Sequence, residues 1–347
     1  MKLDKNIILI DTNPDEGKNF CKALSESTQI EWHLIDCISN EGRTHKYINI
    51  IHYFKYFIFP LRIFLNRKKI DNIVTWQQFY GLIYAFYCRF FHIKKKQSLL
   101  IMTFIYKRKK GIIGKIYHQF IKYIITSKYI DILICTTNKE RFIYSELFNV
   151  NINKFVFVPW GIPDYKSKVY TDESSKEKFI FSTGRSNRDW NFLIKNLKNT
   201  EYKLKIACDE LQYEILNNIE IYNDIHGLKL FQYFQNCYCV IISIEDPNIA
   251  SGQTVLLYAM QFKKPLIVTK SSGLTDDYII NNYNGLIIEK NKDELLNALE
   301  KIYNDKCLYE KLATNGYNEY ETKYSTSMLG KNIGSVLLNS NILIKSF

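Results

Sequence analysis

Short apolar runs alternate with longer segments of helical periodicity along the first half of the chain. The runs are rich in Ile, Leu, Val and Phe, as expected for buried strands. They predict strands at residues 7–11, 31–36, 72–75, 99–104, 131–135 and 155–158. Apolar residues spaced three or four apart predict helices at residues 17–27, 78–92, 115–127 and 138–148. This alternation indicates a parallel sheet that is covered by helices on both faces.

A polar segment at residues 161–178 interrupts the pattern and is typical of a linker. The alternation then restarts, with strands predicted at residues 179–182, 203–207, 240–243, 265–269 and 285–288. Helices are predicted at residues 191–197, 253–261, 277–281 and from 293 onward. The predicted organisation is α/β, with two Rossmann-like domains at 1–160 and 179–328 that face each other across a cleft. Residues 329–347 are expected to form a C-terminal helix that packs back on the first domain.

Composition excludes several other classes of protein. The chain has 347 residues, of which 46% are hydrophobic and 24% charged, so it can bury two cores. Its eight Cys include no Cys-x-x-Cys pair, which favours buried free thiols in a reducing, cytoplasmic compartment. The most hydrophobic stretch, residues 48–65, contains His52, Lys55, Pro60 and Arg62, whereas a membrane span needs about 20 nearly uninterrupted apolar residues. No membrane span and no signal peptide are predicted.

Positive charge is concentrated in the N-terminal half. Residues 1–160 contain 25 Lys and Arg against 12 Asp and Glu, a net charge of +13. Residues 161–347 contain 22 against 23, a net charge of −1. A basic surface of this kind fits an anionic membrane or a nucleic acid. It also fits a merely solvated Lys surface in a chain rich in Ile, Asn, Lys and Tyr. No recognition motif accompanies the charge, which disfavours nucleic acid.

The only two arginines of residues 161–347, Arg185 and Arg188, share one predicted turn. They lie in residues 182–190, which read Ser-Thr-Gly-Arg-Ser-Asn-Arg-Asp-Trp and connect a strand to a helix. An open α/β sheet binds its ligand at such a turn. Arg suits bidentate contact with phosphate, and Gly184 lets the backbone approach closely. A surface arginine paired with Asp189 is the alternative.

A second turn has the sequence Ser251-Gly252-Gln253-Thr254 and opens a predicted helix. The first amides of a helix have no partner in the helix, and its dipole favours an anion there. Capping by Ser251 alone would also explain the sequence. Two such turns in one domain favour a diphosphate held between them. The turns match neither a P-loop nor a dinucleotide fingerprint, because Gly-Lys-Ser/Thr and Gly-x-Gly-x-x-Gly are both missing.

The order of these motifs resembles the C-terminal domain of family 4 glycosyltransferases, which have the GT-B fold. The resemblance covers residues 155–325 and reaches the N-terminal half only through topology. Six motifs carry it: Val158–Ile162, similar to the family's interdomain segment, Gly184-Arg185, Arg188 in the position of a family Lys, Leu256–Met260, Lys264–Thr269 and Asn284-Gly285.

The resemblance implies that Arg185 and Arg188 bind the donor diphosphate and act in catalysis. Donor binding would also involve Gly184, the amides of Ser251–Thr254, and Tyr258. No metal and no other cofactor are implied. The implied donor is a nucleoside-diphosphate sugar, and sugar transfer would retain the anomeric configuration.

Two departures from the family pattern concern recognition of the sugar and the acceptor. The family's Glu-x7-Glu pair falls on Ala250 and Tyr258, so both carboxylates are missing. Tyr258 is left to contact the ribose, and Glu245 or Asp246 are candidates to replace the first carboxylate. The family's N-terminal-domain His has no counterpart after the strand at residues 99–104. His118 and His45 are the candidates, although a lone His on a helix is more often structural.

The resemblance therefore leads us to expect a hexosyltransferase of bacterial capsule or exopolysaccharide synthesis. Its acceptor is expected to be a saccharide, most simply one linked to a lipid diphosphate. The expected location is cytoplasmic, on the anionic inner face of the cell membrane, with no nucleic-acid partner. A catalytically degenerate binding or assembly subunit remains the alternative, because the two family carboxylates are missing.

Overall fold

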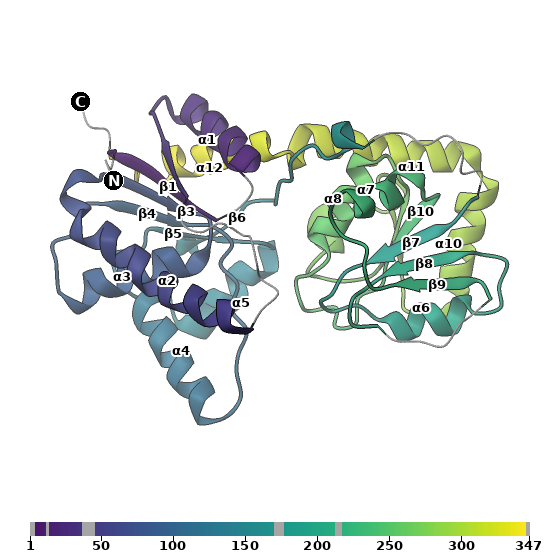
Figure 1. Cartoon of the computed structure of the whole chain (residues 1–347), viewed down its shortest axis with the longest axis horizontal. Coiled ribbons are helices and arrows are strands. Elements are labelled where there is room, and N and C mark those ends of the chain that lie inside the picture. The colour runs from purple at the N-terminus through teal and green to yellow at the C-terminus, as the bar shows by residue number, and fades with distance from the viewer. Residues whose placement is uncertain (1–3, 12–13, 37–45, 170–176, 212–216, 345–347) are drawn as a thin grey trace. The chain divides into compact units, whose positions relative to one another are not determined.

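A computed structural model describes the chain except for residues 1–3, 12–13, 37–45, 170–176, 212–216 and 345–347. The chain forms two compact units (Figure 1). Unit 1 contains Met1–Pro159 together with Thr326–Phe347, and unit 2 contains Trp160–Ser325. The C-terminal helix thus belongs to the unit formed by the N-terminal part of the chain.

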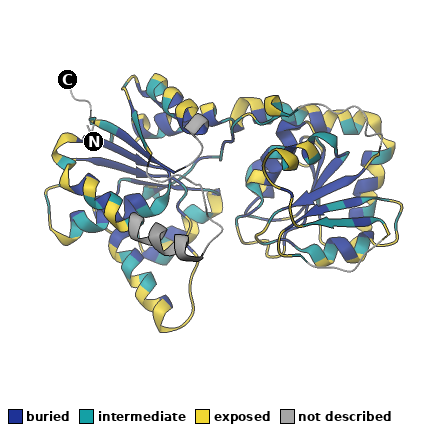
Figure 2. Ribbon diagram, viewed as in Figure 1, coloured by how far each residue is buried: buried dark blue, intermediate teal, exposed yellow. Residues whose placement is uncertain are grey.

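Unit 1 is built on a parallel six-stranded sheet. Its strand order is β2-β1-β3-β4-β5-β6, with the register Ile7 opposite His33 on one side of β1 and Ile73 on the other. The strands are β1 (Asn6–Ile10), β2 (His33–Asp36), β3 (Asn72–Thr75), β4 (Ser98–Ile101), β5 (Ile132–Cys135) and β6 (Phe155–Phe157). Every residue of β3, β4 and β5 is buried, because helices cover both faces of the sheet (Figure 2).

Six helices surround this sheet. They are α1 (Pro14–Thr28), α2 (Lys46–Leu65), α3 (Gln78–Phe90), α4 (Gly111–Ile125), α5 (Asn138–Phe148) and α12 (Thr326–Asn339). Capping by Thr137 and Glu140 starts α5. The hydrophobic stretch that includes Pro60 forms α2. Within the described part of the chain, no helix is long and apolar enough to cross a membrane.

The packing of α12 against α1 depends on two glycines. A Cβ on Gly330 would lie 2.7 Å from the carbonyl oxygen of Phe20, and one on Gly334 would lie 1.9 Å from the Ser27 hydroxyl. Only hydrogen leaves room for this approach. The last helix is therefore fitted closely to the first.

Unit 2 has a second parallel six-stranded sheet, with the order β12-β11-β10-β7-β8-β9. Its strands are β7 (Ile180–Thr183), β8 (Leu204–Ala207), β9 (Ile219–Tyr222), β10 (Cys239–Ile242), β11 (Leu266–Thr269) and β12 (Leu286–Ile288). Its helices are α6 (Trp190–Leu197), α7 (Gly227–Asn236), α8 (Gln253–Gln261), α9 (Thr275–Tyr278), α10 (Lys292–Asn304) and α11 (Lys306–Glu319). A π-helical turn at Tyr320–Tyr324 precedes α12. The predicted α/β class with two Rossmann-like units is confirmed.

Three elements differ from the sequence-based expectation. Strand β9 and helix α7 occupy a segment for which no element was predicted, and residues 46–65 form a helix that was considered only as a membrane span. Of the predicted linker, residues 170–176 lie outside the described residues. The part before them packs on unit 2, where the Gln261 side chain accepts from the Tyr165 amide and donates to the Pro163 carbonyl.

Candidate functional site

The strand order of the unit 2 sheet reverses at β7. From β7 the chain continues to β8 and β9 on one side, and β10 lies against the other side of β7. The turns that follow β7 and β10 therefore meet at the carboxyl edge, where an open α/β sheet binds ligands. These are the turns at residues 182–190 and 251–254, which the sequence predicts to be suited to an anion.

The turn after β7 has an unusual backbone. Gly184 has a φ of +131° and Asn187 a φ of +56°, both in the region that favours Gly or Asn. Asp189 ends the turn by capping α6, since its carboxylate accepts from the Phe192 amide at 2.9 Å. The turn is thus fixed at both ends.

Asn187 joins this turn to the one after β10. Its side-chain oxygen accepts from the Asp246 amide at 2.8 Å. Its side-chain nitrogen donates to the Asp246 carbonyl at 2.9 Å and to the Ser251 hydroxyl at 3.2 Å. An isolated bridge between Arg188 and Ile244 adds backbone contact. The structure therefore brings the two turns together.

Arg188 is buried at the centre of this junction, with a residue exposure of 9%. Its Nε donates to the Thr183 carbonyl at 3.2 Å and its Nη1 to the Ser186 carbonyl at 2.8 Å. No carboxylate among the described residues forms an ion pair with it, and burial lowers the pKa of the guanidinium to about 10. A buried cation without a counter-ion is costly, and an anionic ligand would offset that cost.

Two glycines allow the backbone to approach the Arg188 guanidinium closely. A Cβ on Gly184 would lie 2.7 Å from its Nε, and one on Gly252 would lie 3.6 Å from its Nη2. Gly252 has a φ of +99° and precedes the first residue of α8. The Leu256 amide donates to the Gly252 carbonyl at 2.9 Å, so the amides before it precede the regular helical ladder. The guanidinium and the positive end of α8 thus share one region.

The other predicted residues of this turn have different surroundings. The Ser251 side chain is buried and accepts from Asn187 rather than capping α8. Gln253 donates to the Gly273 carbonyl at 3.3 Å, and Thr254 is exposed. Thr254 is therefore the most accessible side chain of the four.

Arg185 differs sharply from Arg188. Its side chain is 67% exposed, and its Nη2 lies 2.6 Å from the Asp209 carboxylate. The alternative pairing with Asp189 does not occur, because Asp189 pairs with Lys290 at 2.8 Å. The structure places both arginines at the same turn but leaves only Arg188 without a carboxylate.

The structure also describes Tyr258, which stands in the position of one missing family carboxylate, and the two candidate replacements for the other, Glu245 and Asp246. Tyr258 lies edge-on to Tyr165, Phe231 and Phe234, with ring centroids 5.1–5.6 Å apart. Glu245 and Asp246 are exposed on the loop after β10. The backbone of Asp246 is hydrogen-bonded to the Asn187 side chain, so both residues lie close to the junction of the two turns.

The histidine candidates belong to unit 1. The His118 ring makes a hydrogen bond of 3.0 Å with the Tyr106 hydroxyl and stacks on Phe148. Burial, helped by Arg108 and Lys122, lowers the pKa of His118. His45 lies outside the described residues. The contacts of His118 are those of a packed side chain.

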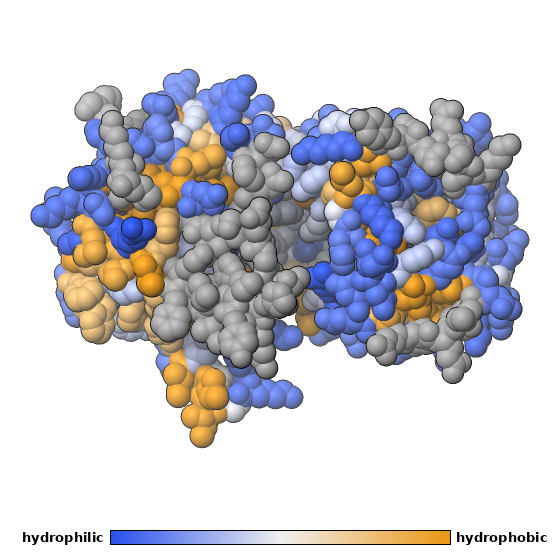
Figure 3. Space-filling model, in the orientation of Figure 1, coloured by the Kyte–Doolittle hydropathy of each residue, from blue (hydrophilic) through white to orange (hydrophobic). Residues whose placement is uncertain are grey.

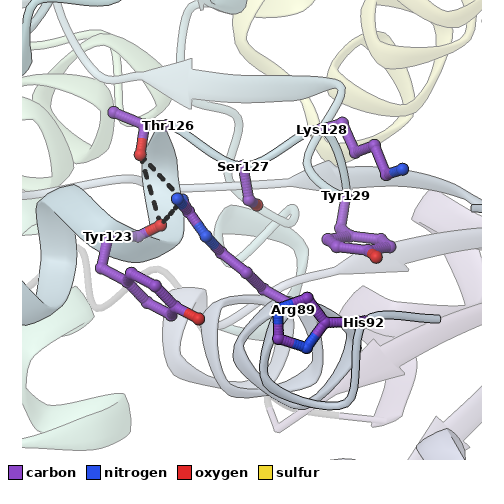
Figure 4. A pocket seen from close by; sticks show the side chains of 7 residues that line it. All are labelled: Arg89, His92, Tyr123, Thr126, Ser127, Lys128 and Tyr129. Atoms are coloured by element: carbon purple, nitrogen blue, oxygen red, sulfur yellow. Dashed lines mark hydrogen bonds between the residues drawn. The ribbon is translucent and has the colours of Figure 1, made fainter.

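A hollow of about 500 Å³ in unit 1 contains Arg89, His92 and Lys128 (Figure 4). Arg89 donates to the Tyr123 carbonyl and, at 2.9 Å, to the Thr126 hydroxyl. Its guanidinium also lies 4.0 Å from the centre of the Tyr123 ring. Arg89 is less buried than Arg188, so its charge is better solvated and has less need of an anionic ligand.

Sequence reasoning missed two residues that hold the site together, Asn187 and Lys290. Asn187 had a local signal, since Asn in a turn tolerates positive φ. Lys290 donates to the Glu245 carbonyl at 3.0 Å as well as pairing with Asp189. It is about a hundred residues away from the turn it contacts, so nothing local in the sequence indicated this role.

Comparison with known proteins matches part of unit 2 to a family model. Residues 174–319 match the family model described as "Glycosyl transferases group 1", which covers most of unit 2 and both turns. No curated protein matches the chain by sequence.

Solved structures match the fold of almost the whole chain. HepE from Anabaena, in complex with UDP, has a TM-score of 0.67 at 11% identity, covering 96% of this chain and 100% of that one. Sucrose-phosphate synthase from Thermosynechococcus elongatus has a TM-score of 0.66 at 14% identity, covering 96% and 98%. A glycosyltransferase from Rickettsia africae has a TM-score of 0.62 at 15% identity, covering 99% and 100%. The chain therefore has the GT-B fold of these enzymes.

Proposed function

We propose that the chain is a glycosyltransferase that takes its sugar from a nucleoside-diphosphate sugar bound at the carboxyl edge of the unit 2 sheet. The observation that carries the proposal is the Arg188 guanidinium, buried between two glycines and unpaired with any described carboxylate. A diphosphate supplies the missing negative charge. HepE, which shares the fold, has been crystallised with UDP and with UDP-glucose.

In this proposal the leaving diphosphate is stabilised by Arg188, the first amides of α8 and Arg185. Positive charge and amide dipoles aimed at a developing anion lower the barrier to departure, and no metal is required for this role. The family resemblance adds retention, with attack on the same face assisted by the leaving phosphate. Gly184 and Gly252 let the backbone of both turns lie against the Arg188 guanidinium, and the family resemblance assigns the amides of Ser251–Thr254 to the phosphate and sugar and Tyr258 to the ribose.

The acceptor we propose is a saccharide linked to a lipid diphosphate, and the transferred group a hexose, in bacterial surface polysaccharide synthesis. The basic N-terminal half supports this choice, because its charge complements a diphosphate and the anionic leaflet that carries it.

A matched pair of arginine variants tests the donor site. Arg188→Met should reduce turnover at least about 100-fold and weaken UDP binding, as removal of a buried charge donor does. It should change the free energy of unfolding by less than about 1 kcal/mol, because relief from burying a charge offsets two lost hydrogen bonds. Arg185→Met is the control for general loss of positive charge and should have the smaller effect. The measurements are calorimetric titration with UDP and UDP-glucose, donor turnover, and thermal unfolding.

Unchanged UDP affinity in Arg188→Met would show that the diphosphate is bound elsewhere. A second candidate function, a degenerate binding subunit, is favoured by Ala250 and Tyr258 at the positions of the two family carboxylates. It predicts that the wild-type protein neither hydrolyses nor transfers nucleotide sugars, whether or not it binds them.

A further inference from the structure

The first turns of α4 expose three isoleucines. Ile112 and Ile113 are each 77% exposed, and Ile116 is 65% exposed. They form an apolar end to the helix that extends beyond the other helices of unit 1 (Figures 1 and 3). Large aliphatic side chains with this exposure on one short segment usually mark an interaction surface.

The rest of the helix is firmly packed. Ile121, Ile124 and Ile125 on its second half are buried in the core of unit 1. The helix of 15 residues is about 22 Å long at 1.5 Å per residue. Its buried C-terminal half therefore holds the exposed N-terminal half in place. The apolar end is thus a rigid feature of the fold.

Basic residues surround this apolar end. Lys107, Arg108, Lys109 and Lys110 precede α4, and Lys115 lies between the exposed isoleucines; all five are exposed. No Asp or Glu occurs anywhere from residue 72 to residue 130, a stretch that contains 11 Lys and Arg. The positive charge beside the apolar end is therefore not neutralised within that part of the sequence.

The basic segment is held close to the helix. A Cβ on Gly114 would lie 2.1 Å from the Lys109 carbonyl oxygen, so the segment before α4 folds back onto its first turns. The Lys109 ammonium lies 4.7 Å from the centre of the Tyr117 ring, within the range of a cation–π contact. Charge and apolar surface are thus positioned together.

We propose that this α4 end, defined by residues 107–116, inserts into the interface of an anionic lipid bilayer. The apolar surface of an interfacial helix is buried about 5–10 Å into the boundary between headgroups and acyl chains. Long Lys and Arg side chains reach back to the phosphates from that depth, and each adds attraction near an anionic surface. Three isoleucines among five cations match both requirements.

A second copy of the chain is a less suitable occupant. Pairing two α4 ends would bring two sets of five cations face to face, and like charges in an interface are repulsive. A bilayer instead has a negatively charged surface above an apolar interior. The cations of the α4 end complement the first and its isoleucines the second. Self-association is nevertheless one outcome that the test below detects.

The role of this contact rests on the proposed function, because a lipid-linked acceptor would bring the enzyme to the membrane. The contact itself does not depend on catalysis. It is measured by vesicle binding without donor or acceptor, whereas donor binding is measured without vesicles. Failure of either proposal is therefore recognisable separately.

The test is co-sedimentation of the full chain with vesicles of phosphatidylglycerol and phosphatidylcholine, or of phosphatidylcholine alone. The insertion variant is Ile112→Asn with Ile113→Asn. Its matched control is Leu228→Asn with Ile280→Asn, two residues of unit 2 that are each 58% exposed. Wild type and control should bind the anionic vesicles, and the insertion variant should bind about tenfold more weakly, since removing buried aliphatic surface lowers partition by at least that factor.

Thermal unfolding and UDP affinity should be the same in all three proteins, because the substituted side chains are exposed. Binding should also weaken in high salt and on neutral vesicles, where the charge contribution is lost. Equal binding of insertion variant and control, or no binding of wild type to anionic vesicles, would overturn the proposal. A wild-type dimer in sedimentation velocity that the insertion variant lacks would identify the surface as a self-association interface and would also overturn it.

Discussion

In both sheets the strand order reverses once, but different residues lie at the point of reversal. In unit 2 the change lies between β7 and β10, where Gly184 and Gly252 flank the buried Arg188. In unit 1 it lies between β1 and β3, and the residue after β3 is Trp76, 7% exposed and edge-on to Phe20 at 5.1 Å. One position has glycine and charge, and the other has a packed aromatic ring. The described residues at the two positions therefore offer an anion different surroundings.

The units also differ in where their charge lies. Residues 161–347 have a net charge of −1, and the buried Arg188 guanidinium of unit 2 forms no ion pair with a carboxylate of the described residues. In unit 1 the four consecutive cations before α4, residues 107–110, are all exposed. Buried charge suits a small anion that must be desolvated, and exposed charge suits an extended anionic surface. This difference agrees with the two partners proposed above, a nucleoside-diphosphate sugar for unit 2 and an anionic lipid surface for unit 1.

After the Arg188 variant, the largest effect is expected from a methyl group added at the junction in unit 2. Gly252→Ala introduces a Cβ 2.8 Å from Leu274 Cδ2 at a φ of +99°, which costs about 1–3 kcal/mol in strain. Because Gly252 precedes α8 beside Arg188, UDP affinity should fall about tenfold or more. Gly227→Ala is the control, since Gly227 has a φ of +55° with no atom near its Cβ position. Equal UDP affinity in the two variants would show that space beside Arg188 is not needed.

The sequence was informative where the signal was local. The strand–helix alternation predicted most strands, and the scarcity of arginine in the second half drew attention to Arg185 and Arg188 before their positions were known. It did not distinguish them, because only tertiary structure shows that Asp209 pairs with Arg185 while Arg188 is buried. Strand β9 was missed since it is a short strand at the sheet edge with one buried residue of four. Lys290 was missed because its partners are distant in sequence.

A second glycine tests whether unit 1 can be destabilised without affecting the site in unit 2. Gly330→Ala places a Cβ 2.7 Å from the Phe20 carbonyl in the α1–α12 contact, and overpacking of this kind costs about 1–3 kcal/mol. Gly316→Ala, in α11, is the control, with its nearest atom at an ordinary 3.4 Å. Chemical denaturation should show lower stability for Gly330→Ala alone, with UDP affinity unchanged in both. A matching loss of UDP affinity in Gly330→Ala would contradict the separation of the two units' roles.

The smallest effect concerns the contact that Lys290 makes between the two turns. Its ammonium pairs with Asp189 at 2.8 Å and donates to the Glu245 carbonyl at 3.0 Å, so it holds the end of the first turn against the second. Lys290→Met should raise the Kd for UDP about two- to fivefold, the scale of one partly exposed ion pair. Lys270→Met is the matched control, because Lys270 pairs with Glu289 at 2.9 Å but contacts neither turn through that bond.

The Lys290 result also separates positioning from simple attraction of the anion. If charge alone matters, both Lys variants should weaken UDP binding equally at low salt and converge with wild type at high salt. If the contact positions the turns, only Lys290→Met should weaken binding, and the difference should persist at high salt because it depends on geometry. Equal affinities throughout would mean that the hydrogen bonds of Asn187 suffice to hold the turns together, and that the junction in unit 2 is more rigid than the ion pair suggests.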